Sequence, residues 1–151
     1  MFALSYAVEV NPAGVNPVLS RGQVWRGLEM KAEDARPFVK GMTKCEVLER
    51  DGNQLLRDVT FAGESFRERI TFHAPVQVHF ERVGQGGFIE NTISDSPLGL
   101  LLTFTFGLNF PGVTPGSPEE RAKGEGMREA YIGAVAATLD RVRIMAREGT
   151  L

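Results

Sequence analysis

The 151-residue sequence predicts an α+β fold in which a seven-stranded antiparallel sheet packs against one long C-terminal helix. Three features of the sequence lead to this prediction. Apolar and small or polar residues alternate at the N-terminus, which is the pattern of a half-buried strand. Six further runs with strand character lie between residues 43 and 110, separated by short turn signals. After residue 117 the apolar spacing changes to three and four residues, which is typical of an amphipathic helix.

The N-terminal third of the chain predicts one strand followed by two short helices. Residues 2–10 alternate with a period of two and form the expected strand. Ser20 and Gln23 have the spacing of a capping box, which predicts a helix that runs to about Ala32. Asp34 is expected to cap the second, shorter helix directly afterwards.

Turn signals rich in Gly, Pro, Asn and Asp divide the middle of the chain into six strands. The short connections make each strand antiparallel to the one before it. The last run is the longest, and Gly99 and Gly107 offer places where it can bend. The six runs cover residues 43–50, 54–62, 65–73, 76–83, 88–95 and 98–110.

The C-terminal segment predicts a helix of about thirty residues, roughly 46 Å long. Ser117 and Pro118 have the pattern of a helix start, and Gly149 is a natural stop. Small residues, among them Ala134 and Thr138, lie on the stripe that faces the sheet. Because protein interiors are close-packed, the space above these residues must hold either large side chains of the sheet or a cavity.

Four segments resemble one protein family when they are taken together and in order. They read LSRGQVWRGL over residues 19–28, LRDVTF over 56–61, LTFTF over 102–106 and AATLDRVR over 136–143. This set resembles the AtaL-like branch of the START and birch-pollen-allergen superfamily (SRPBCC). The resemblance implies a helix-grip fold over residues 1–151 as a single domain, with a curved sheet wrapped around the long C-terminal helix. It also implies a hydrophobic cavity, and it supplies no catalytic residues.

The register of the central strands places two charged residues on the apolar face of the sheet. A turn at Gly63–Glu64 and a three-residue connection at 73–75 align apolar with apolar side chains, and they make Arg57 and Glu68 diagonal neighbours. Because an isolated buried charge is costly, the two should pair or meet a polar ligand. They are interpreted either as a structural ion pair or as the polar end of a ligand cavity. The same face is expected to hold Leu55, Val59, Phe61, Phe66, Ile70, Phe72, Val76, Val78 and Phe80.

Three more residues are candidates for the wall of the cavity. Asn91 faces inward if the glycine-rich turn before it has an even number of residues, and this register is favoured because two β-branched residues, Ile89 and Ile93, then also face inward. If the number is odd, Glu90 faces inward instead. Tyr131 lies on the inward stripe of the long helix, where its hydroxyl needs a protein or ligand partner. Trp25 either packs in the core or covers the ligand.

Composition argues against several other functions. The net charge of -2 does not favour a broad nucleic-acid surface. No run of about 18 apolar residues predicts a membrane span. Cys45 is the only cysteine, and with His73 and His79 it makes too small a set for a zinc site, so we expect no metal and no cofactor. The N-terminus lacks the basic start of a signal peptide, which predicts a cytoplasmic protein.

The sequence therefore favours a protein that encloses a hydrophobic small molecule between the sheet and the C-terminal helix. A lipid, a polyketide or an aromatic metabolite would suit the phenylalanine-rich wall. The alternative is an enzyme related to the polyketide cyclases and aromatases of the same superfamily, with Glu68 as a buried acid or base. Whether the protein is an enzyme and whether it forms a homodimer stay open at this point.

Overall fold

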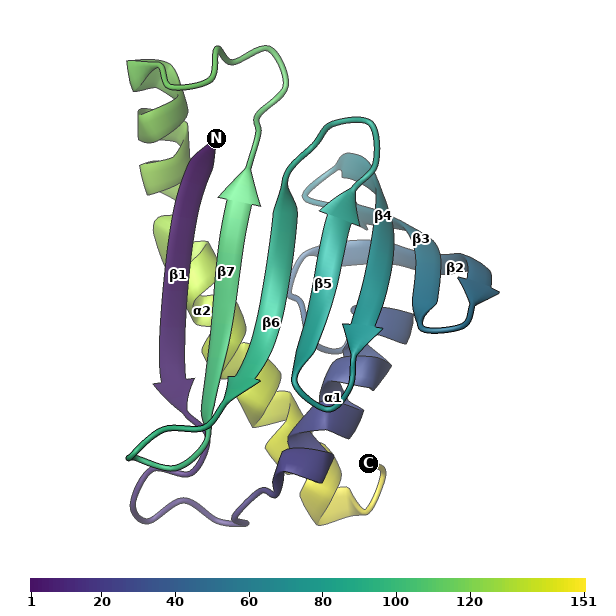
Figure 1. Cartoon of the computed structure of the whole chain (residues 1–151), viewed down its shortest axis with the longest axis vertical. Coiled ribbons are helices and arrows are strands. Elements are labelled where there is room, and N and C mark those ends of the chain that lie inside the picture. Colours follow the sequence, from purple (N-terminus) through teal and green to yellow (C-terminus); the bar gives the residue numbers. More distant parts are fainter.

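Seven strands form one antiparallel sheet, and two helices cover one of its faces (Figure 1). The computed structural model describes residues 1–151. The strands lie in the spatial order β1-β7-β6-β5-β4-β3-β2. The elements are β1 (Phe2–Glu9), α1 (Arg21–Glu33), β2 (Met42–Asp51), β3 (Gln54–Phe61), β4 (Glu64–His73), β5 (Gln77–Arg82), β6 (Phe88–Ser94), β7 (Leu101–Leu108) and α2 (Pro118–Glu148).

The structure has one helix after β1 where the sequence predicted two. The capping box of α1 forms as expected, with the Ser20 hydroxyl accepting from the Gln23 N–H and the Gln23 side chain accepting from the Ser20 N–H. The segment after Asp34 makes only a single turn, in which the Phe38 N–H donates to the Ala35 carbonyl. This turn is not continued because the chain passes through Gly41, at a φ of 90°, directly into β2.

The turn between β3 and β4 lies one residue earlier than predicted, and the face assignments are nevertheless correct. Ala62 and Gly63 both have positive φ, 50° and 80°, which is the conformation of a two-residue hairpin turn. Moving a turn by one residue shifts each cross-strand partner by two, so no side chain changes face. Arg57 consequently lies directly opposite Glu68 and not diagonal to it.

The connection between β4 and β5 has the predicted three residues but begins one residue later, at Ala74. Val76 therefore lies in the turn and is 44% exposed, so its predicted inward position was wrong. The register of β6 is the favoured one, with Ile89 opposite Phe80 and Asn91 opposite Val78. The predicted long last strand shortens to β7, because its partner β1 ends at Glu9, opposite Leu101.

The long helix α2 runs diagonally behind the sheet from β1 towards α1 (Figure 1). It begins with the predicted Ser117 cap and ends at Gly149 in the left-handed conformation. Two glycines allow close approaches that position it. A side-chain carbon at Gly124 would lie 2.2 Å from the Phe2 ring, and one at Gly27 of α1 would lie 2.4 Å from the Val142 side chain of α2.

The packed core lies mainly at the end of the sheet where the two helices meet. Its fully buried side chains include Val10, Leu19, Val24, Leu28, Ile93, Leu102, Val135 and Val142. Neither helix is both long and apolar enough to cross a bilayer. The part of α2 between its two close approaches carries small residues towards the sheet, and this arrangement leaves room for a cavity.

Two glycines of the same helix should respond in opposite directions to alanine. Gly124→Ala should destabilise the protein by about 1–3 kcal/mol, because the new methyl group overlaps the Phe2 ring. Gly126→Ala should stabilise it by up to about 1 kcal/mol, since Gly126 has open space around it and alanine favours the helix. Urea unfolding of both variants measures the difference, and equal shifts would contradict the close packing of α2 on β1.

Candidate functional site

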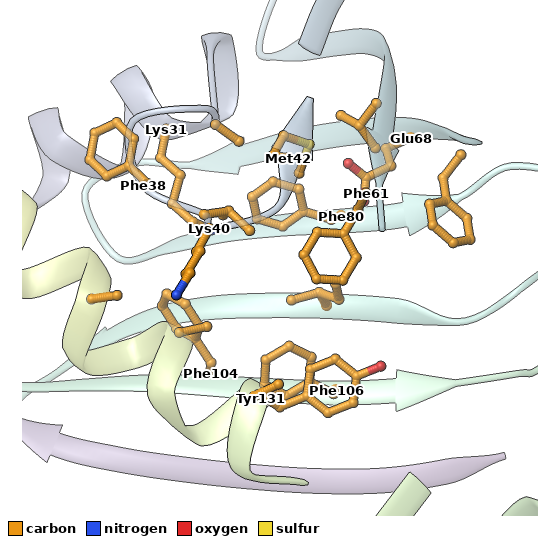
Figure 2. A pocket seen from close by; sticks show the side chains of 18 of the residues that line it. Lys31, Phe38, Lys40, Met42, Phe61, Glu68, Phe80, Phe104, Phe106 and Tyr131 are labelled. Atoms are coloured by element: carbon orange, nitrogen blue, oxygen red, sulfur yellow. The ribbon is translucent and has the colours of Figure 1, made fainter. Parts of the chain in front are cut away.

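A cavity of about 440 Å³ lies between the sheet, α2 and the segment that connects α1 to β2 (Figure 2). Sixteen of its 22 lining residues are hydrophobic. The sheet contributes large rings, whereas α2 contributes mostly small side chains. The apolar lining residues are Ala35, Phe38, Val39, Met42, Val59, Phe61, Phe66, Phe80, Ile89, Phe104, Phe106, Met127, Tyr131, Ala130, Ala134 and Ala137.

The small residues of α2 form the open side of the cavity. Ala130, Gly133 and Ala137 line the cavity and are also exposed to solvent. Lys40 lies on the connecting segment at the same open side and is exposed as well. The predicted space above the small stripe of α2 is thus a cavity with an entrance, although Thr138 does not line it.

A buried ion pair joins the floor of the cavity to the end of α1. Arg57 and Glu68 are 3% and 4% exposed, and the Arg57 Nε and Nη2 groups both donate to Glu68 Oε1, at 3.0 and 2.8 Å. The Arg57 Nη1 group donates to the carbonyls of Lys31 and Ala32, at 3.0 and 2.8 Å. These carbonyls belong to the last turn of α1, where a cation is favourable.

The structural ion pair that the sequence offered as one interpretation is present, and its role towards a ligand stays a prediction. It is structural, because it links β3, β4 and α1, and both of its members also line the cavity. Glu68 Oε2 makes no hydrogen bond in the structure and is a free acceptor on the cavity side of the pair.

Lys31 is a buried charged residue of the cavity wall that was not predicted from the sequence. Its side chain is 7% exposed, and its Nζ donates to Asn91 Oδ1 at 3.0 Å. The ammonium position lies 5.1 Å from the centre of the Phe80 ring and 4.9 Å from that of Phe104 (Figure 2). No carboxylate lies within 4 Å of Nζ. The nearby Glu68 is already bonded to Arg57.

This environment favours the uncharged amine. Burial, together with the positive charge of Arg57, lowers the pKa of Lys31 from 10.5 to about 7. The negative charge of Glu68 and the thiol of Cys45 act in the opposite direction and are weaker. A sequence signal for Lys31 exists: it lies seven residues after Val24 and therefore on the apolar stripe of α1.

Six of the nine predicted site residues line the cavity, namely Arg57, Glu68, Tyr131, Phe61, Phe66 and Phe80. Asn91 is fully buried behind Lys31, and its Nδ2 group has no partner. Trp25 and Phe72 lie outside the cavity and contact each other edge to face, with ring centres 6.3 Å apart. Trp25 therefore packs in the core and does not cover the cavity.

Tyr131 and Arg82 form a second, less enclosed polar region of the wall. The Tyr131 ring stacks on Phe106 with 4.6 Å between ring centres, and its hydroxyl donates to the sulfur of Met127, a weak acceptor. Burial raises the pKa of Tyr131. Arg82 was not predicted from the sequence, and it lies over the Phe66 ring at 4.1 Å.

The outer face of the sheet carries both histidines away from the cavity, as the register predicted. His79 belongs to β5, which lies between β4 and β6, and its Nδ1 is 3.1 Å from Glu90 Oε1 on the outer face. His73 is exposed at the end of β4. No group of three or more His, Cys, Asp or Glu side chains is arranged to hold a metal ion.

Comparisons with known proteins point to one family and one fold. A family model described as acetylaranotin biosynthesis cluster protein L matches residues 4–149. The chain is 24% identical over 152 residues to acetylaranotin biosynthesis cluster protein L of Aspergillus terreus (strain NIH 2624 / FGSC A1156), covering 99% of this chain and 93% of that protein.

Solved structures of aromatase/cyclases share the fold at low sequence identity. The Zhui aromatase/cyclase from Streptomyces sp. R1128 is 16% identical with a TM-score of 0.69, and the match covers 98% of this chain and 97% of that one. The di-domain aromatase/cyclase BexL from the BE-7585A biosynthetic pathway is 13% identical with a TM-score of 0.66. That match covers 94% of this chain and 48% of BexL, so the chain spans about half of the BexL length.

Replacing Lys31 with methionine should stabilise the protein in a manner that depends on pH. Between the folded pKa of about 7 and the ordinary value of 10.5, the folded protein binds fewer protons than the unfolded chain, so its stability rises with pH. The destabilising effect of Lys31 is therefore complete below about pH 7. Methionine fills a similar volume without a charge, and this gain should exceed the roughly 1–3 kcal/mol lost by leaving Asn91 unpaired.

Thermal unfolding at several pH values measures this effect. Lys31→Met should raise the unfolding midpoint by roughly 3 °C or more below pH 7, and the gain should shrink as the pH approaches 10.5. Lys40→Met, at the exposed rim, is the control and should show no such trend. A Lys31 variant that is less stable at every pH would contradict the assigned environment.

Proposed function

The chain belongs to the family of acetylaranotin biosynthesis cluster protein L, and on this premise we propose that it binds an apolar small molecule in its cavity. The ligand class is an aromatic or polyketide-like compound with a polar group at one end. One observation carries the proposal: a cavity of about 440 Å³ has a phenylalanine-rich wall and a single enclosed polar end. Ligand pockets typically combine these two features.

The apolar wall supplies affinity for such a ligand. Each Å² of apolar surface removed from water contributes about 25 cal/mol. The rings of Phe80, Phe106 and Tyr131 line the cavity, and aromatic faces and edges of this kind suit a planar ligand. The exposed Ala130 and Ala137 of α2 leave an open entrance through which a small molecule can reach the cavity.

The enclosed polar end supplies orientation. Arg57 uses its donors on Glu68 and on α1, so it has little left for a ligand. Glu68 Oε2 is the free acceptor, and a ligand hydroxyl can donate to it. The Lys31 amine lies in the same wall and can meet a ligand carbonyl. We therefore expect the hydroxyl or carbonyl end of the ligand to lie deep and its hydrocarbon end to face α2.

Blocking the entrance should weaken binding without harming the fold. Ala137→Trp places a large ring in the open side of the cavity and should weaken the binding of β-naphthol at least about tenfold, a change of about 1.4 kcal/mol. Ala136→Trp is the matched control, because Ala136 is an exposed neighbour on α2 that does not line the cavity. A fluorescence titration measures both, and equal affinities would argue against binding in this cavity.

Native mass spectrometry of the freshly purified protein gives independent information on the ligand class. A co-purified aromatic or polyketide-like molecule, absent from the Ala137→Trp variant, supports the proposal. A co-purified molecule that is retained by this variant would place the binding site elsewhere.

A second candidate function is catalysis of the aromatase or cyclase type, for which the fold neighbours provide precedent. The observation that favours it is the enclosed Glu68 carboxylate, whose Oε2 has no partner in the protein and can accept a proton from a bound substrate. The Arg57 guanidinium fixes the direction of this oxygen.

Deuterium exchange into the methyl group of β-acetonaphthone tests Glu68 as a base. Glu68→Gln should slow the protein-catalysed exchange by about a hundredfold, the usual lower contribution of general base catalysis. Glu64→Gln, an exposed change at the start of β4, should leave it unaltered. Binding of β-naphthol verifies that the cavity of Glu68→Gln is intact. Undiminished exchange in that variant would remove Glu68 from the mechanism.

A further inference from the structure

We propose that Lys31 is the reactive group of the cavity, and that its amine condenses with a ketone or aldehyde carbon of the bound molecule to form an imine. This inference rests on the proposed function, because it needs a carbonyl-bearing ligand in the cavity. It adds a covalent step and a substrate class, β-dicarbonyl and related keto compounds, to a site otherwise described by shape and polarity.

The geometry sets Lys31 apart from the other basic residues of the cavity. Arg57 is bound to a carboxylate and two carbonyls, and Lys40 is exposed to solvent. Lys31 is buried between the rings of Phe80 and Phe104, has no ion-pair partner and makes one side-chain hydrogen bond, to Asn91. Burial and the charge of Arg57 lower the pKa of this amine to about 7, so a substantial fraction of it is unprotonated at neutral pH and can act as a nucleophile.

Asn91 is placed to orient the amine. Its Oδ1 accepts one N–H of Lys31, and this bond fixes Nζ at the cavity wall. The Asn91 side chain is fully buried, and its Nδ2 group has no partner within the protein. A buried asparagine with only one of its two polar groups hydrogen-bonded contributes little to stability. Its presence behind Lys31 is explained if its role is to hold Nζ in position.

The step balances without an oxidant or a reductant. The Nζ lone pair forms a bond to the carbonyl carbon, and the carbonyl π electrons move to oxygen, which takes up a proton from the amine. The resulting hydroxyl group then leaves as water with the second amine proton, while the nitrogen lone pair closes the C=N bond. The products are one imine and one water, which can leave through the open side of the cavity at Ala130 and Ala137.

Benzoylacetone is the probe for this inference, because a β-diketone and an amine give a stable enaminone with loss of one water. Intact-protein mass spectrometry should show one adduct per chain, and peptide mapping should locate it on Lys31. Lys31→Met should lose the adduct completely. Lys44→Met is the matched control, since Lys44 is an exposed lysine of β2 that does not line the cavity, and it should retain the adduct in full.

The pH dependence of adduct formation gives a second readout. The groups that face Lys31 from the neighbouring strands are Arg57 of β3, Glu68 of β4 and Cys45 of β2. Burial and Arg57 together place the pKa of Lys31 near 7, so the rate should rise through about pH 7 and then level off. An exposed lysine would give a rate that keeps rising towards 10.5.

The outcomes separate this inference from the proposed function. Adducts that persist in Lys31→Met, or that spread over exposed lysines, would overturn the role of Lys31. If β-naphthol binds in the cavity and benzoylacetone forms no adduct, the imine is excluded while the binding function stands. If neither compound binds, the proposed function itself fails. Asn91→Ala should slow adduct formation and still permit it, as expected for a positioning residue.

Discussion

The guanidinium of Arg57 is the interaction on which the arrangement of this protein depends. It reaches from β3 to the carboxylate of Glu68 on β4 and to two carbonyls at the end of α1. These bonds join the central strands to α1, the helix that comes directly after β1. The carbonyl of Lys31 is one of the two acceptors, so the same bonds that hold the helix also fix where the Lys31 side chain begins. A buried pair of this kind is costly to desolvate, and its four hydrogen bonds to Glu68 and the end of α1 offset that cost.

The backbone of α2 comes especially close to its neighbours at two glycine positions. Gly124 allows it to approach Phe2 of β1, and Gly27 of α1 allows the approach of Val142. The residues of α2 that line the cavity, from Met127 to Ala137, lie between these two points in the sequence. Between them, Val135 and Leu139 pack in the core, whereas small residues such as Ala130 and Ala137 line the cavity. The position of the cavity thus depends both on Gly27 and Gly124, which allow the close approaches, and on the alanines of α2 that line it.

The sequence was sufficient to predict which side chains of the central strands face the interior, but not which of them line the cavity. Period-two alternation assigned Arg57, Glu68 and Asn91 to the interior even though both predicted turns were displaced by one residue, because such displacements leave the faces unchanged. Period-two alternation assigns a side chain to a face of the sheet, but it does not tell whether that side chain reaches the cavity. Asn91 is interior but separated from the cavity by Lys31, which reaches it from α1. Contacts between a helix and a distant strand depend on how the helix lies on the sheet, and no local pattern in this chain reports that.

Lys31 and the Arg57–Glu68 pair illustrate two different reasons for polar groups in an apolar interior. The ion pair satisfies nearly all of its own hydrogen bonds and links three elements, so the fold alone accounts for it. An apolar residue of similar length would fill the space of the Lys31 side chain equally well. Burial of the Lys31 amine opposes stability below its ordinary pKa of 10.5. Its partner Asn91 is itself left half-satisfied. Destabilising features of this kind concentrate at functional sites. The ion pair accordingly defines the shape of the polar end, and the unpaired amine beside it supplies the chemistry that we assign to the cavity.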